Sequence, residues 1–191
     1  MVSTPSWCDK IECGCVSNGE RIWIGMGVVA RDHEGNVVAA AVRRLRAWWP
    51  PQIAEGRAIL LAVKLARRLR HENIIIESDC ESLIQRLSKA STYLSDFDNV
   101  LEDILASCSV FDSIQWIHVK RDDNLVAHHL AKLVPFGTEQ VWVNHYPYEI
   151  SPYVISIRQF VLLLVHQFLT FKKKEANKNN WILQLQSSLF T

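Results

Sequence analysis

The sequence predicts an α/β fold with a mixed β-sheet, and changes in the spacing of apolar residues carry that prediction. Apolar runs rich in β-forming residues occupy residues 22–30 and 37–42. A helical spacing of apolar residues follows over 53–69, after which short strands alternate with helices. The chain has 191 residues, 49% of them hydrophobic, so it can bury one core and carry extensions.

The first three predicted elements are antiparallel strands. Residues 22–30 and 37–42 flank a turn signal at 32–36, which predicts a hairpin of two long strands. Residues 11–16 predict a strand before it, because an apolar run there meets the turn-forming residues 17–19.

The later elements alternate between helical and strand patterns. A long helix begins at Pro50-Pro51, where a missing N–H does no harm. It is followed by a buried strand at 74–76, helices at 79–87 and 97–108, a strand at 113–119 and a helix at 124–133. We expect five strands, the first three antiparallel, with helices packed on the sheet through crossover connections.

The domain boundaries follow from composition. We expect an N-terminal extension at 1–7, the α/β domain at 8–150, and a divergent extension at 151–191 that is first apolar and then basic. The apolar stretch at 160–171 is too short for a bilayer span, which needs about 20 residues. It suits an interfacial amphipathic helix, a partner-binding helix or a poorly ordered appendage.

Charge and cysteine usage limit the choice of environment and partner. The formal net charge is +1, so any nucleic-acid partner must be argued from local basic patches. The five cysteines include no CxxC pair, and no signal peptide precedes them, which favours a reduced compartment, the nucleus or the cytoplasm. The sequence indicates no zinc site and no small-molecule cofactor.

Two acids indicate chemistry. Glu55 opens the first long helical pattern, and Asp79 closes a buried strand. Carboxylates at a helix start and a strand end can converge on divalent metal ions, which favour phosphodiester chemistry. Each acid also has a purely local explanation, because Asp79 can cap the following helix and Glu55 suits the positive end of its own helix.

Four sequence blocks together resemble the ribonuclease H domain, and most closely a plant branch related to non-LTR retrotransposons. The blocks are residues 25–35 (GMGVVARDHEG), Ala54-Glu55, residues 77–82 (ESDCES) and residues 119–132 (VKRDDNLVAHHLAK). The resemblance implies a five-stranded sheet and four acids around two Mg²⁺ ions. Glu55 and Asp79 match the second and third acids.

The other two acid positions depart from the family pattern. The first-strand aspartate falls on Gly14, which has no side chain, and the fourth acid falls on His128. Imidazole can ligate Mn²⁺ or transfer protons, whereas Mg²⁺ prefers oxygen. Glu12 lies on the same strand face as Gly14 and is a candidate replacement ligand.

Basic residues supply candidate substrate contacts. Arg121 and Asn124 precede the last helix. They either position substrate, or Asp123 or Asn124 caps that helix. Two basic groups accompany them in the sequence: Arg43, Arg44 and Arg46 beside Trp48 and Trp49, and Lys64, Arg67, Arg68 and Arg70 near a helix end. The first group suits a nucleic-acid groove or a solvated strand end, and the second suits phosphate binding or simple stabilisation of the helix.

Two functions follow. The first is hydrolysis of the RNA strand of RNA–DNA hybrids, with Glu55, Asp79 and His128 as catalytic residues and weakly bound Mg²⁺ or Mn²⁺ held by Glu55, Asp79 and Glu12. The second is an inactive, transposon-derived domain that binds nucleic acid, or a protein partner through its C-terminal extension.

Overall fold

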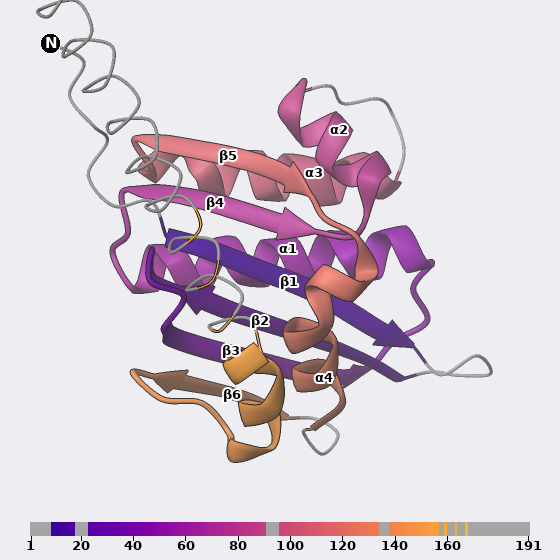
Figure 1. Ribbon diagram of the computed structural model, residues 1–191. Helices are drawn as coiled ribbons and strands as arrows, with labels where there is room; N and C mark the ends of the chain where they lie inside the picture. Colours follow the sequence, from indigo (N-terminus) through magenta and orange to yellow (C-terminus); the bar gives the residue numbers. More distant parts are fainter. Residues whose placement is uncertain are drawn as a thin grey trace, which may run out of the picture.

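The computed structural model describes residues 9–17, 23–90, 96–133 and 138–156, together with 159, 163 and 167. Within them lies one six-stranded sheet (Figure 1). The strands are β1 (Asp9–Ser17), β2 (Trp23–Arg31), β3 (Val37–Arg46), β4 (Asn73–Ser78), β5 (Ser113–His118) and β6 (Thr138–Val143). The helices are α1 (Pro51–Arg68), α2 (Glu81–Ser88), α3 (Asp96–Ser107) and α4 (Leu125–Leu133), with short 3-10 turns η1 (Cys108–Val110), η2 (Arg121–Asn124) and η3 (Tyr148–Ile150).

The sheet order is β5-β4-β1-β2-β3-β6. Strands β1, β2 and β3 pair antiparallel in chain order, whereas β4 and β5 run parallel to β1 after helical crossovers. The mixed α/β sheet expected from the sequence is therefore confirmed. The carboxyl ends of β1 and β4 lie side by side, which brings residues from two distant parts of the chain to one edge of the sheet.

Each face of the sheet is covered by its own helices (Figure 1). Helix α1 packs on β1 and β2 and contacts α3, and the buried residues of this face form the larger core. Helix α4 packs on β1, β2 and β3 on the opposite face, where Leu130 joins a smaller cluster with Val29 and Val154. Alternate residues of β1 serve the two faces, as strand geometry requires.

Helix α4 approaches the sheet closely because β2 carries glycines on that face. A Cβ added at Gly27 would lie 2.1 Å from the carbonyl oxygen of Ala127, and one added at Gly25 would lie 2.1 Å from that of Ala131. These distances leave no room for a side chain. The glycines therefore bring α4, which carries His128, down onto the sheet.

Strand β6 departs from the sequence-based expectation of five strands. It pairs antiparallel with β3 from Ala39↔Val143 to Arg44↔Thr138 and extends the sheet beyond the hairpin. The following helical residues 151–156 bring Val154 into the smaller core. Among the described residues, none of the helices has both the length and the apolarity of a membrane span. Most of the expected C-terminal extension lies outside the described residues.

Candidate active site

Asp79 is the centre of the candidate site. It follows β4, and both of its carboxylate oxygens are engaged: Oδ1 accepts a hydrogen bond from Asn124 Nδ2 at 3.1 Å, and Oδ2 lies 3.1 Å from His128 Nε2. Burial alone would raise the pKa of Asp79, but the contacts with His128 and Asn124 outweigh it and lower the pKa below its usual value. Both oxygens of the Asp79 carboxylate are therefore already engaged by protein groups.

The local capping explanation for Asp79 is wrong. The residue at the N-cap of α2 is Cys80, and no side chain caps this helix. Ser78 instead accepts a hydrogen bond from the Cys80 backbone N–H at 3.2 Å. The side chain of Asp79 is thus free to face α4 and η2.

Glu55 lies on the other side of the β1 end. It occupies the second turn of α1, and its Oε1 accepts a hydrogen bond from the Cys15 thiol at 3.1 Å. Burial is the main cause that raises its pKa to about 7, with the Cys15 hydrogen bond opposing the shift and repulsion from Asp79 adding to it. The electrostatic influence of Asp79 and His128 on this carboxyl places all three groups in one neighbourhood.

Gly14 lies where a first-strand side chain would enter this neighbourhood. A Cβ built on Gly14 would lie 3.1 Å from His128 Cε1 and 3.2 Å from Asn124 Nδ2. Both distances are tighter than ordinary van der Waals contact. His128 and Asn124 thus fill the space beside Gly14 and close over Asp79.

Glu12 does not take the place of the missing acid. Its buried carboxylate pairs with the Arg31 guanidinium, which also lies 4.0 Å from Glu77. Lys10 pairs with Glu77 at 3.0 Å and extends the cluster along the same strand face. The Glu12 alternative therefore fails because a buried cation two strands away from Asp79 already holds this side chain.

The two candidate substrate residues differ in their surroundings. Asn124 is fully buried, and its amide donates both to Asp79 and to the Cys13 carbonyl oxygen at 2.8 Å, so its side chain holds the site rather than capping α4. Arg121 is 71% exposed at its side chain and lies 3.9 Å from Asp79 Oδ2. Arg121 is therefore a solvent-exposed cation beside Asp79.

Sequence reasoning missed Cys15 and Arg31. Cys15 stands one residue after Gly14 on the opposite strand face, and only the fold brings its thiol to Glu55. Arg31 ends a strongly apolar strand, and a lone cation in such a strand is the signal that could have indicated a buried ion pair with Glu12.

The donor set does not match a pair of magnesium ions. Such a site needs several free carboxylate oxygens in near-octahedral geometry. Here Gly14 supplies none, both oxygens of Asp79 are engaged, and His128 presents nitrogen. Within the described ranges, no three His, Cys, Asp or Glu side chains are grouped to hold one metal ion.

The mixed sheet, the crossover helices and the acids beside the β1 and β4 ends define a ribonuclease H-like protein. A sequence model described as reverse transcriptase-like matches residues 14–134, well over half of the chain. The chain belongs to this reverse transcriptase-like family. No curated protein matches it significantly.

Solved structures agree on the fold. The N-terminal RNase H domain of a Mycobacterium tuberculosis protein, solved as a fusion with maltose-binding protein, is 22% identical over 65% of this chain and 91% of its own length, with a TM-score of 0.59. RNase H1 of the halophilic archaeon Halobacterium salinarum is 21% identical over 65% and 92%, with a TM-score of 0.57. LC11-RNase H1, solved in complex with an RNA/DNA hybrid, is 16% identical over 64% and 92%, with a TM-score of 0.58.

Proposed function

We propose that this chain is a ribonuclease H-type domain that binds RNA–DNA hybrids and whose hydrolysis of the RNA strand is severely impaired. The observation that carries this proposal is the closed arrangement at Asp79. His128 and Asn124 occupy its two oxygens and fill the space beside Gly14. The nucleus and the cytoplasm are the compartments in which such a domain would meet its substrate.

Hybrid binding is supported by the fold and by one exposed cation. LC11-RNase H1 shares this fold and was solved with an RNA/DNA hybrid. Arg121 stands beside Asp79 with its guanidinium in solvent, where it can contact a phosphate. Binding of this kind needs no metal ligand, so the loss of the first acid leaves it intact.

Metal-dependent hydrolysis in Mg²⁺ or Mn²⁺ is the second candidate, and two polar atoms favour it. Glu55 Oε2 and His128 Nδ1 are buried without a hydrogen-bond partner among the described residues. Unsatisfied buried polar atoms are costly, and a cation near Glu55 would relieve one of them. Glu55 and Asp79 would be its ligands, with His128 as an auxiliary group.

The binding test measures the fluorescence anisotropy of a labelled RNA–DNA hybrid with added chelator. We expect Arg121→Gln to weaken binding and to lower the slope of log affinity against log salt by about one, because one phosphate contact is lost. Arg68→Gln, which removes the same charge from the distant end of α1, is the matched control. Equal loss in both variants, or no binding by the unchanged chain, would defeat the proposal.

The cleavage test compares the unchanged chain with the double variant Gly14→Asp/His128→Asp in Mg²⁺ and in Mn²⁺. Restoring the four acids should increase hybrid cleavage by about 100-fold or more, a typical effect of one catalytic electrostatic group. Glu55→Gln in the double-variant background should abolish the gain. Rapid cleavage by the unchanged chain would instead establish the hydrolytic candidate.

A further inference from the structure

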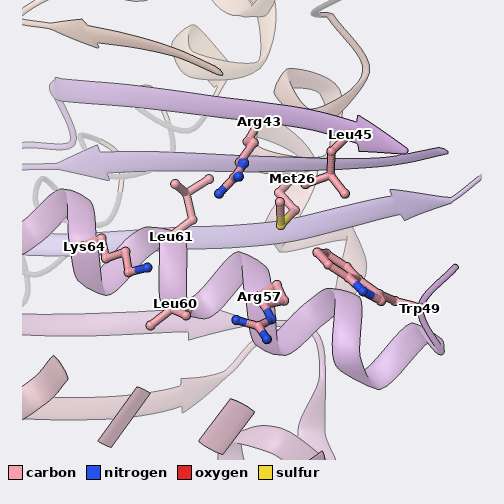
Figure 2. Close-up of a pocket in the computed structure, with 8 residues that line it drawn as sticks. All are labelled: Met26, Arg43, Leu45, Trp49, Arg57, Leu60, Leu61 and Lys64. Atoms are coloured by element: carbon pink, nitrogen blue, oxygen red, sulfur yellow. The ribbon is translucent and has the colours of Figure 1, made fainter. Parts of the chain in front are cut away.

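A pocket of about 410 Å³ lies between α1 and the β2–β3 hairpin (Figure 2). It is lined by Met26, Arg43, Leu45, Trp49, Arg57, Leu60, Leu61 and Lys64. Its volume falls within the range of about 300–1,000 Å³ that is usual for small-molecule sites. The pocket can therefore hold a ligand of a few tens of atoms, but not a duplex.

Among the residues that the structure describes, three cations and no acid line this pocket. Arg43 comes from β3, whereas Arg57 and Lys64 come from α1 on the facing wall (Figure 2). Exposed acids contact two of them from outside, with Glu139 at 3.5 Å from Arg43 and Asp103 at 3.4 Å from Arg57. Exposed pairs of this kind are weak, so both guanidinium groups stay available to an anion.

The remaining lining is aromatic and apolar. Trp49 forms one end of the pocket, and the Arg57 guanidinium lies 5.8 Å from the centre of a Trp49 ring. This cation–π contact holds the indole in place before a ligand binds. Ligand binding therefore costs little side-chain entropy at Trp49. Met26, Leu60 and Leu61 supply the apolar surface beside it. A ligand with a flat aromatic group can therefore stack on Trp49 and bury carbon surface, while a negatively charged group of the same ligand contacts the cations.

The pocket is separate from the Asp79 site yet near it. Cys15 is paired across the sheet with Met26, and Met26 with Arg43, so two strand spacings, about 10 Å, separate the backbones of Cys15 and Arg43. All three side chains face α1. Asp79 and His128 meet on the α4 side instead. One polynucleotide could reach both places.

We propose that this pocket binds a single nucleotide unit, with its base against Trp49 and its phosphate between Arg43 and Lys64. The unit comes either from the single-stranded part of a nucleic acid or from a free nucleotide. Cations with a stacking surface are the combination by which proteins hold unpaired nucleotides. This inference goes beyond the proposed binding of hybrid at Asp79 and does not depend on it.

The test uses two labelled single-stranded oligonucleotides of equal length, one with bases and one abasic, with anisotropy as readout. Trp49→Leu should raise the Kd of the base-bearing strand at least about fivefold and leave the abasic strand within about twofold. Trp49→Phe should restore most of the affinity, which separates stacking from misfolding. Lys64→Gln should weaken both strands and lower the salt slope by about one. The control is Arg68→Gln, an exposed cation of the same helix outside the pocket.

A third arm adds AMP as competitor and identifies the source of the nucleotide. Displacement by AMP that Trp49→Leu and Lys64→Gln both weaken supports a free nucleotide as ligand. Binding of the base-bearing strand without displacement by AMP supports a nucleic-acid source. Equal affinity for both strands, or no effect of either pocket variant relative to Arg68→Gln, overturns the proposal. If that result is accompanied by hybrid binding that depends on Arg121, only the Asp79 proposal stands.

Discussion

At the scale of single residues, the candidate site is defined by how its charges are compensated. Asp79 is held by contacts with His128 and Asn124, whereas Glu55 is buried with a thiol as its hydrogen-bond donor. The two carboxyls consequently have pKa values that move in opposite directions from their usual values. The same pair that family resemblance assigns to one metal site thus behaves as two different groups.

Glu55 should make stability depend on pH. Its pKa rises from 4.5 to about 7 on folding. Between pH 4.5 and about pH 7, the folded state therefore holds a proton that the unfolded state has lost. The free energy of unfolding should therefore fall by about 3 kcal/mol as pH rises from about 4.5 to 7. Urea unfolding at about pH 5 and pH 8 checks this, and Glu55→Gln should flatten the dependence. Glu81→Gln, a change at an exposed acid of α2, should leave the pH dependence of stability unchanged. If the stability of the unchanged chain does not depend on pH, the raised pKa of Glu55 is contradicted.

Arg31 should be required for stability because it is the buried partner of Glu12. Arg31→Met leaves the Glu12 carboxylate buried without its cation and should cost about 3–5 kcal/mol in the free energy of unfolding. The double variant Glu12→Met/Arg31→Met should recover most of this loss, because an apolar pair replaces an ion pair without stranding a charge. Chemical denaturation of the three proteins makes the comparison. A single variant as stable as the unchanged chain would show that the pair contributes nothing.

At the scale of elements, the close packing of α4 on the sheet determines where His128 lies. Gly27→Ala would place a methyl group 2.1 Å from a backbone carbonyl of α4, which cannot rotate away. We expect a loss of about 3 kcal/mol or more, at the upper end of overpacking effects. Gly56→Ala is the comparison variant, since its new methyl would meet the Val100 side chain at 2.7 Å rather than a backbone atom. The higher helix propensity of alanine at position 56 offsets the crowding by about 1 kcal/mol.

Urea unfolding distinguishes the two glycine variants. Equal stability of Gly27→Ala and Gly56→Ala would contradict the close seating of α4. Hybrid binding by Gly27→Ala provides a second readout, because a displaced α4 moves His128 away from Asp79.

Most elements could be predicted because their periodicity is local. The hairpin turn at Asp32 and Asn36 and the proline start of α1 are encoded within a few residues, and the structure has both. Strand β6 escaped prediction because its run Val141-Trp142-Val143 is short and its partner, β3, is distant in sequence. The positions of Glu55 and Asp79 were readable, but their partners Cys15 and Asn124 were not, because long-range packing brings them together.

At the scale of the whole molecule, the described residues up to 156 include a six-stranded sheet with a core on each face. Ile150 and Val154 close the smaller core against α4, and β6 covers the edge of β3. The predicted boundary at 150, with an extension from 151, stays a prediction that truncation can test.

A chain ending at residue 156 keeps all the described residues of both cores and should unfold within about 1 kcal/mol of the full chain. A chain ending at residue 133 loses β6, Ile150 and Val154 and should lose several kcal/mol, since each buried aliphatic side chain contributes about 1.5–3 kcal/mol. Thermal and urea unfolding compare the three lengths. Equal stability of the two truncated chains would place the end of the domain before β6.

The close fit of His128 and Asn124 beside Gly14 makes an acid at position 14 hard to introduce by a single substitution. Gly14→Asp alone would crowd His128, and His128→Asp alone would set a second carboxylate against Asp79 with no cation between them. Each single change passes through a less stable protein. A chain that carries this pair of residues could gain four acids only by two coupled substitutions, so selection for folding alone would preserve the present site.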